Sequence, residues 1–263
     1  MKKLGKIYLA LVLFFLYVPI FVLIVFSFNE SKSRSVFSGF TLDWYRKLFQ
    51  NDIIISSLVN TIIIAVLASI ISTVLGTLAA IGINGMRKVP KAVVMNITNM
   101  PIINPEIVTG VSLMLLFVFF AARMNLEFGF VTLLIAHITF DVPYVILNIM
   151  PKFRQMDPHL YEAAQDLGCS PFSAFIKVVL PEIMPGVVSG FLMAFTYSLD
   201  DFVISYFTSG SSSQTLPVTI YSMTRRKVSP EINALSTIIF GVVVIILIVK
   251  NVIELRQMKK KEA

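Results

Sequence analysis

The sequence predicts an all-α, polytopic membrane protein with six transmembrane helices. Hydrophobic residues make up 56% of the chain and charged residues only 14%, with a mean hydropathy of +0.83, which lies outside the range of soluble domains. A bilayer core of ~30 Å needs about 20 apolar residues in a helix. The chain has such runs at residues 7–28, 58–83, 102–122, 130–150, 183–206 and 233–250. Runs this long must be helices, because no water satisfies backbone groups inside the bilayer.

The first run follows the basic segment MKKLGK. It is too long for a secretory signal and no small-x-small cleavage site follows it, so we expect a retained helix. With the N-terminus inside, lysine and arginine concentrate in the cytoplasmic segments, which predicts that both termini face the cytoplasm. The net charge of +7 mostly reflects this bias. It indicates contact with anionic lipid headgroups and no nucleic-acid partner.

Small residues line one face of the second and fifth predicted helices. The stripes are Thr61, Ala65, Ser69, Ser72, Gly76 and Ala80, and then Gly186, Gly190 and Ala194. Such faces let helix backbones approach closely in lipid. We interpret the stripes as packing surfaces; the alternative is that one of them lines a pathway at a subunit interface.

The predicted cytoplasmic loop between the fourth and fifth helices, YEAAQDLGCSPFSAFIKVVLP, is unusually polar. Asp157-Pro158 and Ser170-Pro171 are helix-start signals, Gly168 is placed to end the first short helix, and Pro181 to end the second. The spacing puts an apolar stripe on one side of the first helix. The stripe consists of Leu160, Ala163, Ala164 and Leu167. Either this side docks into a groove of a cytoplasmic partner or it rests on lipid.

The order of Glu162-Ala163-Ala164, Gly168 and Leu180-Pro181 resembles the EAA loop of type I ABC importer permeases, with Val178 where isoleucine is usual. The resemblance implies the MetI-like fold, and a coupling helix that sits in a groove of a cytoplasmic ATPase. Glu162 would meet a basic residue there. Ala163 and Ala164 would permit close approach, Gly168 would turn the chain, and Leu180 and Pro181 would close the motif.

The chain also resembles PotC-type permeases of spermidine/putrescine importers. The matching segments are GFTLDWYRKL, AHITF, SLDDFVISYFTSG, LPVTIYSM and SPEINALST, while the acid in FDVPY and the stretch SSSQT depart from the pattern. The resemblance implies a bacterial inner-membrane subunit that pairs with a PotB-like permease, two PotA-like ATPases that bind ATP and magnesium, and a PotD-like extracytoplasmic binding protein. The cargo would be a polyamine, spermidine or putrescine; the alternative is another small substrate.

The same resemblance divides the chain into three parts. Residues 1–57 form a first helix with an outer loop that carries a short amphipathic segment. Residues 58–250 form the transmembrane domain, with the coupling loop at 152–182, and residues 251–263 form a basic cytoplasmic tail.

Two acids near the outer end of the fifth helix favour a cationic cargo independently of the resemblance. A charged aspartate inside a membrane helix costs free energy of insertion, so a functional role would explain the presence of Asp200 and Asp201. A polyamine would supply one, because carboxylates and aromatic faces both bind ammonium groups. The aromatic residues nearby in the sequence are Tyr197, Phe202 and Tyr206. The alternative is that both aspartates lie in the headgroup zone and bond neighbouring helices.

Other polar residues carry weaker hypotheses. Asp141 follows His137 by four residues, which suits a local pair that satisfies both side chains. Glu106 follows Asn104-Pro105, so its carboxylate either complements a helix dipole or contacts cargo.

The outer segments are also ambiguous. The segment that contains Trp44, Tyr45, Arg46 and Lys47 either lies at the membrane interface or contacts the binding protein. The cluster of Arg225, Arg226 and Lys227 lies in a predicted outer segment, although lysine and arginine are otherwise concentrated in the cytoplasmic segments. It is either a solvated turn or a surface for an acidic rim of the binding protein.

Catalytic motifs are missing from the sequence. The sequence has no glycine-rich phosphate loop, so ATP must be hydrolysed by another subunit. It has no HExxH motif and only two histidines and one cysteine, Cys169, so a metal site is not expected. We therefore predict no catalytic residue and no cofactor in this chain. The rival classes are an intramembrane aspartyl protease that uses Asp141 and Asp200, and a passive cation channel. An EAA loop serves neither.

Overall fold

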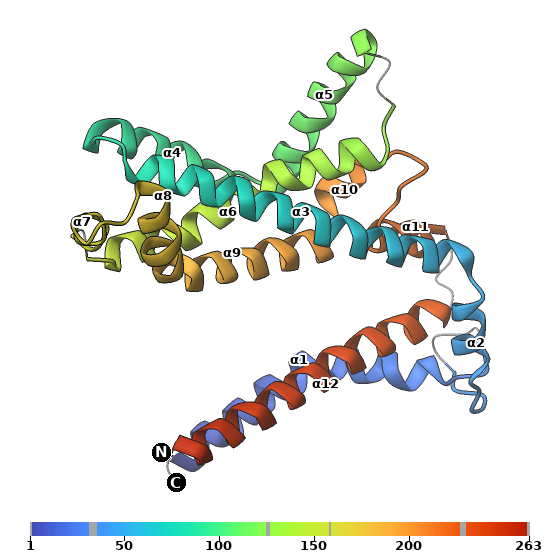
Figure 1. The fold of residues 1–263 in the computed structure, drawn as a ribbon. Helices are drawn as coiled ribbons and strands as arrows, with labels where there is room; N and C mark the ends of the chain where they lie inside the picture. Colours follow the sequence, from blue (N-terminus) through green and yellow to red (C-terminus); the bar gives the residue numbers. More distant parts are fainter. Residues whose placement is uncertain (1, 32–35, 125–126, 158, 227–229, 262–263) are drawn as a thin grey trace. The chain divides into compact units, whose positions relative to one another are not determined.

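The fold is mainly helical in the part of the chain that the structure describes, where the other regular pairing is an isolated β-bridge between Asn29 and Phe40. The computed structural model describes residues 2–31, 36–124, 127–157, 159–226 and 230–261 (Figure 1). The long helices are α1 (Lys2–Ser27), α3 (Asp52–Asn84), α4 (Lys88–Ile103), α5 (Glu106–Met124), α6 (Phe130–Gln155), α9 (Leu180–Asp200) and α12 (Pro230–Lys261). The short ones are α2 (Asp43–Phe49), α7 (Leu160–Asp166), α8 (Pro171–Ala174), the π-helical turn η1 (Phe175–Val179), α10 (Val203–Thr208) and α11 (Leu216–Arg226).

The predicted membrane helices are present. Within the described residues, five stretches are long and apolar enough to span a bilayer, and a shorter apolar helix covers Pro230–Val242. The five stretches are Gly5–Ser27, Asp52–Asn84, Glu106–Arg123, Phe130–Gln155 and Pro171–Asp200. The predicted all-α, multi-pass fold class is therefore confirmed.

The chain divides into two compact units, Met1–Ile55 with Ile220–Ala263, and Ser56–Thr219. In the first unit, α12 packs against α1 and α2. Trp44 of α2 is buried, and its indole N–H donates to the carbonyl of Asn29 at 2.7 Å. Trp44 thus packs in the interior of this unit.

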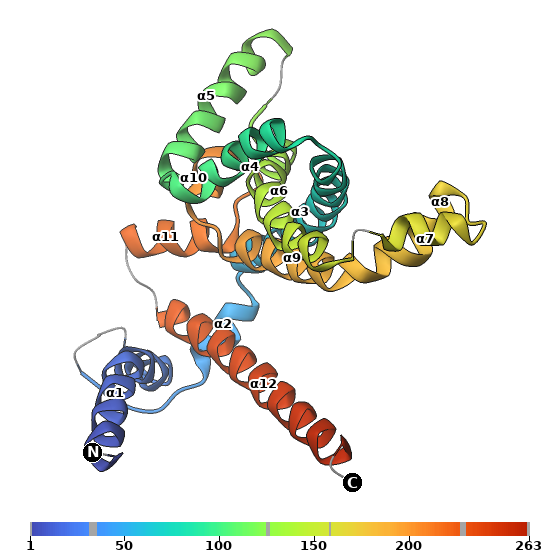
Figure 2. The same ribbon diagram turned by 90° about the vertical axis from the view of Figure 1, so that its left-hand side faces the viewer.

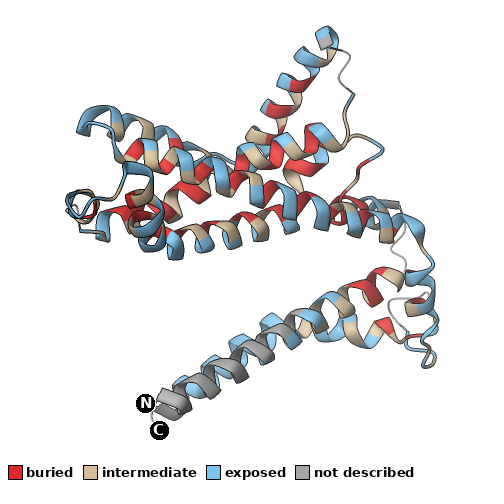
Figure 3. Cartoon of the chain, in the orientation of Figure 1, coloured by how far each residue is buried: buried red, intermediate tan, exposed pale blue. Residues whose placement is uncertain are grey.

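The second unit is built around α3, α6 and α9. Figure 2 looks nearly along α6, with α9 seen at an angle to it, and Figure 3 shows buried residues on the sides of these helices that lie toward one another. The residues that form this core include Ala80, Val145, Ile149, Ile183 and Ala194. A second apolar cluster joins α5, α6 and α10 through Leu113, Phe117, Ala136, Phe140 and Ile204.

The small-residue stripes are packing surfaces, as interpreted from the sequence. All six residues of the α3 stripe are buried, and so are the three of α9. A Cβ atom on Gly76 would lie 2.6 Å from Cγ1 of Val145, and one on Gly190 would lie 3.2 Å from Cα of Val145. Glycine at these two positions is what allows α6 to lie against both neighbours.

Three features of the fold differ from the expectation. The fifth membrane helix does not continue to residue 206, because α9 ends at Asp200 and α10 begins at Val203. Pro181 does not end a helix, because Pro171–Asp200 forms one continuous helical stretch. The amphipathic α4 occupies a segment that was expected to be a loop, with lysines at its start.

Candidate functional site

The loop after α6 ends its first helix with a glycine turn. The Gly168 amide donates to the carbonyl of Gln165 at 2.8 Å, and the Cys169 amide donates to that of Ala164 at 3.1 Å. Gly168 has a φ of 89°, in the left-handed region that favours glycine. This pair of bonds is a Schellman motif, so the predicted role of Gly168 in ending α7 is confirmed.

The second helix of the loop starts as the sequence predicted. The hydroxyl of Ser170 accepts from the Ser173 amide, and Pro171 occupies the first turn. The chain then passes through η1, where the Leu180 amide donates to the carbonyl of Phe175, five residues back. The widened turn lies directly before Pro181, whose ring would crowd an ordinary helical turn. The π-helical turn therefore accommodates Pro181 in the first turn of α9 without ending the helix.

Several side chains of this loop are exposed on its surface. Leu167 is 87% exposed and Phe172 is 75% exposed, so this loop presents two large apolar side chains on its surface. Glu162 and Ala163 are exposed as well, whereas Ala164 is buried within the chain. The two alanines therefore differ: Ala163 is available to another protein, and Ala164 serves packing inside the loop.

The two aspartates at the end of α9 have different environments. Asp200 is exposed. Asp201 has an extended backbone with ψ of 124°, and its carboxylate accepts from the amides of Ile204 at 3.2 Å and Ser205 at 2.7 Å. Its side chain is only 5% exposed. Asp201 thus caps α10, which explains why the helix breaks here.

A buried histidine joins this junction to α6. His137 is 2% exposed; its Nδ1 bonds the Ser198 hydroxyl of α9, and its Nε2 lies 3.0 Å from the Ser205 hydroxyl of α10. Nε2 is also 3.6 Å from Oδ2 of Asp201, within ion-pair distance when the imidazole is protonated. These four residues, His137, Ser198, Asp201 and Ser205, are called the His137 cluster below.

Asp141 does not pair with His137, contrary to the hypothesis drawn from their spacing. The His137 ring faces α9 and α10 instead, because three polar groups converge on it there. Asp141 is fully buried, and neither of its carboxylate oxygens has a hydrogen-bond partner among the described atoms.

Aromatic rings lie beside the junction. The rings of Tyr197 and Tyr144 are 4.5 Å apart between centroids, and Phe140 lies 5.2 Å from Tyr144. Phe202 and Tyr206 form a separate pair at 5.6 Å. The structure therefore brings Tyr197 together with α6 rings that the sequence did not single out, and it places Phe202 with Tyr206 on the α10 side.

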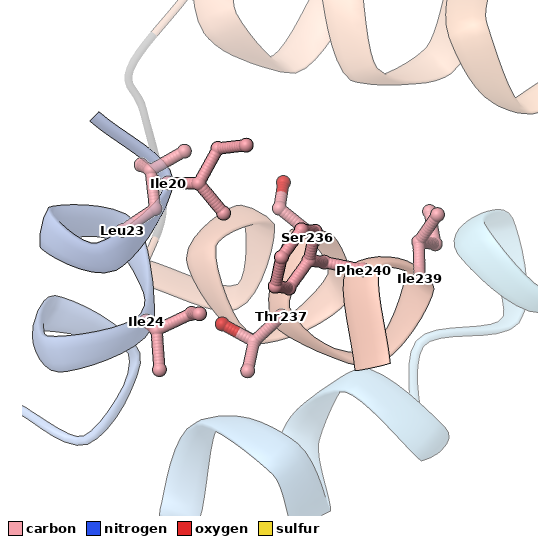
Figure 4. Close-up of a pocket in the computed structure, with 7 residues that line it drawn as sticks. All are labelled: Ile20, Leu23, Ile24, Ser236, Thr237, Ile239 and Phe240. Carbon is pink, nitrogen blue, oxygen red and sulfur yellow. The ribbon is translucent and has the colours of Figure 1, made fainter. Parts of the chain in front are cut away.

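An apolar pocket of about 320 Å³ lies between α1 and α12 in the first unit (Figure 4). Its lining consists of Ile20, Leu23, Ile24, Ser236, Thr237, Ile239 and Phe240. No carboxylate is among these residues, so the pocket offers an ammonium group no charged partner.

Sequence reasoning missed His137, Ser198 and Ser205 as site residues. One signal was available: His137 is one of two histidines in the chain and lies within an apolar run of α6. Its partners come from helices about 60 residues further along, and no local spacing indicates them.

Residues 72–255 match the family described as the binding-protein-dependent transport system inner membrane component. The putrescine transport system permease PotI of Escherichia coli K12 is 40% identical over 243 residues, which is 88% of this chain and 84% of PotI. The spermidine/putrescine permease PotC of Haemophilus influenzae is 39% identical over 89% of this chain and 90% of that protein.

Among solved structures, a chain of a bacterial ABC transporter that imports alginate aligns with a TM-score of 0.70 at 14% identity, covering 96% of this chain and 95% of that one. A chain of an amino acid ABC transporter aligns with a TM-score of 0.52 at 22% identity, covering 77% and 94%. At these identities the two structures support the fold alone.

Proposed function

The chain belongs to the family of binding-protein-dependent transport system inner membrane components, and from that premise we propose that it is a permease subunit of an ATP-driven polyamine importer. The observation that carries the cargo class is the similarity to polyamine permeases over about nine tenths of the chain. The subunit forms half of the translocation pathway in a bacterial inner membrane. Its partners are a PotB-like permease, a PotA-like ATPase dimer and a PotD-like binding protein.

The junction between α9 and α10 supports a cationic cargo. Asp200 is the exposed acid of the pair, so it is the carboxylate that can meet an ammonium group. Asp201 is engaged by two backbone amides and acts by shaping the junction. The face of Tyr197, partly exposed beside Tyr144, adds a surface to which ammonium groups are attracted.

The loop from α7 to η1 supports coupling to an ATPase. Its two short helices are fixed by the Gly168 turn and the Ser170 cap, so the exposed side is a defined surface. The loop exposes the Glu162 carboxylate, which lies 3.6 Å from Nδ1 of His159, and the apolar side chains of Leu167 and Phe172. Exposed apolar side chains beside a carboxylate suit a groove that contains a basic residue. The loop continues through η1 into α9, which links docking to the helix that ends at Asp200.

Uptake of labelled putrescine and spermidine by cells tests this proposal. The chain is expressed with its partner permease, ATPase and binding protein in a bacterial strain that lacks polyamine import. We expect uptake that requires this chain and an active ATPase. A complex that assembles in the membrane and raises uptake of neither polyamine contradicts the cargo class.

A further inference from the structure

Asp141 has no explanation in the function proposed above. It is 0% exposed in the middle of α6, and both its oxygens lack hydrogen-bond partners among the described atoms. A carboxyl group buried in this way destabilises the conformation that contains it, most strongly when it is ionised. A second conformation in which the carboxyl group has a partner avoids this cost, so the unpaired carboxyl shifts the equilibrium toward that conformation.

The register of the helices locates Asp141 within the second unit. Val145 packs against Gly76 of α3 and Gly190 of α9. Two turns of α6 earlier, His137 meets Ser198 of α9. Asp141 lies midway between these two layers, so it belongs to the packed face between the helices and not to the lipid-facing side.

His137 and Tyr144 are the polar residues three or four positions from Asp141 on α6, and of the two only the imidazole can carry a positive charge. Side chains four residues apart lie on the same face of a helix with their Cβ atoms ~5–6 Å apart. In the described conformation, however, the imidazole bonds Ser198 and Ser205 and lies 3.6 Å from Asp201. His137 therefore stands between two carboxylates. Asp201 has two amide donors besides the histidine, and Asp141 has none.

We propose that His137 is a latch with two positions: it holds α10 through Asp201 and Ser205 in the described conformation, and it pairs with Asp141 in a second conformation in which α10 has moved away from α6. Asp141 and His137 are positioning residues, since they act through α10 and do not touch cargo. The latch rests on the proposed function in one respect, because the transport cycle is what would move α10.

The construction of α10 fits such a movement. It is a helix of six residues that follows an extended residue, Asp201, whose backbone can act as a hinge. It supplies Ser205 to the His137 cluster, and Asp201 leads directly into it. Displacement of α10 would therefore remove two of the partners of His137 at once, while Asp141 stays on the same helix as the histidine.

The latch makes a prediction about two opposite substitutions. Asp141→Asn keeps the size of the side chain and removes the carboxylate, so the second conformation loses its charged partner. Asp201→Asn weakens the hold on α10 in the first conformation. The two changes should shift the same equilibrium in opposite directions, by roughly tenfold for Asp141→Asn, the scale of one charged hydrogen bond, and by more than tenfold for Asp201→Asn, which also weakens the bonds to the amides of Ile204 and Ser205.

Amide hydrogen exchange measured by mass spectrometry on the intact complex tests this, with peptides that cover residues 202–208. Exchange there reports opening of α10 and needs no cargo. We expect slower exchange in Asp141→Asn, faster exchange in Asp201→Asn, and a rate between those of the two single variants in the double variant. Thr139→Val, an exposed position on the same helix, is the control and should leave exchange unchanged.

Uptake is the second readout. A latch requires that Asp141→Asn slow polyamine uptake in step with the slower opening of α10. If exchange in residues 202–208 is the same with and without Asp141, in both the unsubstituted and the Asp201→Asn background, the latch is wrong. The exchange result stands even if the unsubstituted complex transports no polyamine, so failure of the latch and failure of the proposed function are distinguishable.

Discussion

Asp200 and Asp201 are neighbours in the sequence, and the structure predicts that the same substitution affects them differently. Asp200 is exposed at the end of α9. Asp201 is buried, caps α10 and lies 3.6 Å from His137. Replacement of each by asparagine keeps the size of the side chain and removes its charge. We expect Asp200→Asn to impair transport and Asp201→Asn to impair stability first.

The magnitudes follow from the contacts. An asparagine at position 201 has one acceptor oxygen for two amides, at 3.2 Å and 2.7 Å, and directs an N–H group at the other. Loss of a charged hydrogen bond and of one donor's partner costs about 2 to 4 kcal/mol in total. An exposed substitution at Asp200 should change the free energy of unfolding by less than ~0.5 kcal/mol. A lost ammonium contact of ~1.5 to 3 kcal/mol should lower uptake roughly tenfold to a hundredfold.

Both variants are compared in the same membranes by uptake of labelled spermidine, by recovery of the assembled complex and by thermal unfolding. Asp201→Asn should lower the midpoint of thermal unfolding by several degrees, and Asp200→Asn should leave it unchanged while uptake falls. An Asp200→Asn complex that assembles and transports at the original rate refutes the role of this acid in the pathway. An Asp201→Asn complex of unchanged thermal stability refutes the capping role.

Three further predictions concern the loop, the core and the outer surface. Gly168→Asp should leave the subunit in the membrane but abolish ATP-dependent uptake, because the side chain strains a backbone with φ of 89°; normal uptake with normal ATPase co-purification would contradict this. Gly76→Ala should lower the free energy of unfolding by about 1 to 3 kcal/mol, because the added Cβ would lie 2.6 Å from Cγ1 of Val145. Gly82→Ala is the control: a Cβ there has no neighbouring atom within 4 Å, so the free energy of unfolding should stay the same or rise slightly. Arg225→Glu should weaken docking of the binding protein, most at low salt; an affinity unchanged at low ionic strength would show that Arg225 belongs to a solvated turn.

The membrane helices could be predicted because each is an independent signal in the sequence. A run of about 20 apolar residues indicates a helix whatever it packs against. The same holds for the local signals at Gly168 and Ser170, whose capping bonds join residues at most five apart. The Gly168 turn and the Ser170 cap were therefore predicted correctly, whereas α7 begins only at Leu160 and Pro158 of the predicted start signal lies outside the described residues.

The helix break at Asp201 and the course of the chain at Pro181 could not be predicted in this way. Apolar residues continue past Asp201, so hydropathy predicts one helix to residue 206, and only the bonds from Ile204 and Ser205 reveal a cap. At Pro181, the proline indicates a stop unless a π-helical turn precedes it. Residues 84–101 lie between two of the predicted apolar runs, so the search for membrane helices did not indicate α4.

The pairing of His137 shows a limit of spacing arguments. Four residues separate it from Asp141, and this favours a local pair. The structure turns the imidazole toward Ser198, Ser205 and Asp201 instead. A long-range cluster replaced the local pair because α6 packs against α9 and α10, which no single-helix pattern contains.

The central claim is that this chain carries polyamines across a membrane when a partner ATPase acts on its loop. The most direct test uses the complete complex in lipid vesicles, with binding protein and labelled putrescine on one side and ATP on the other. We expect saturable accumulation that requires ATP and the binding protein, and that is lost when Glu162→Ala is introduced. Accumulation that is independent of ATP, or that is equal in complexes with and without Glu162→Ala, would contradict it.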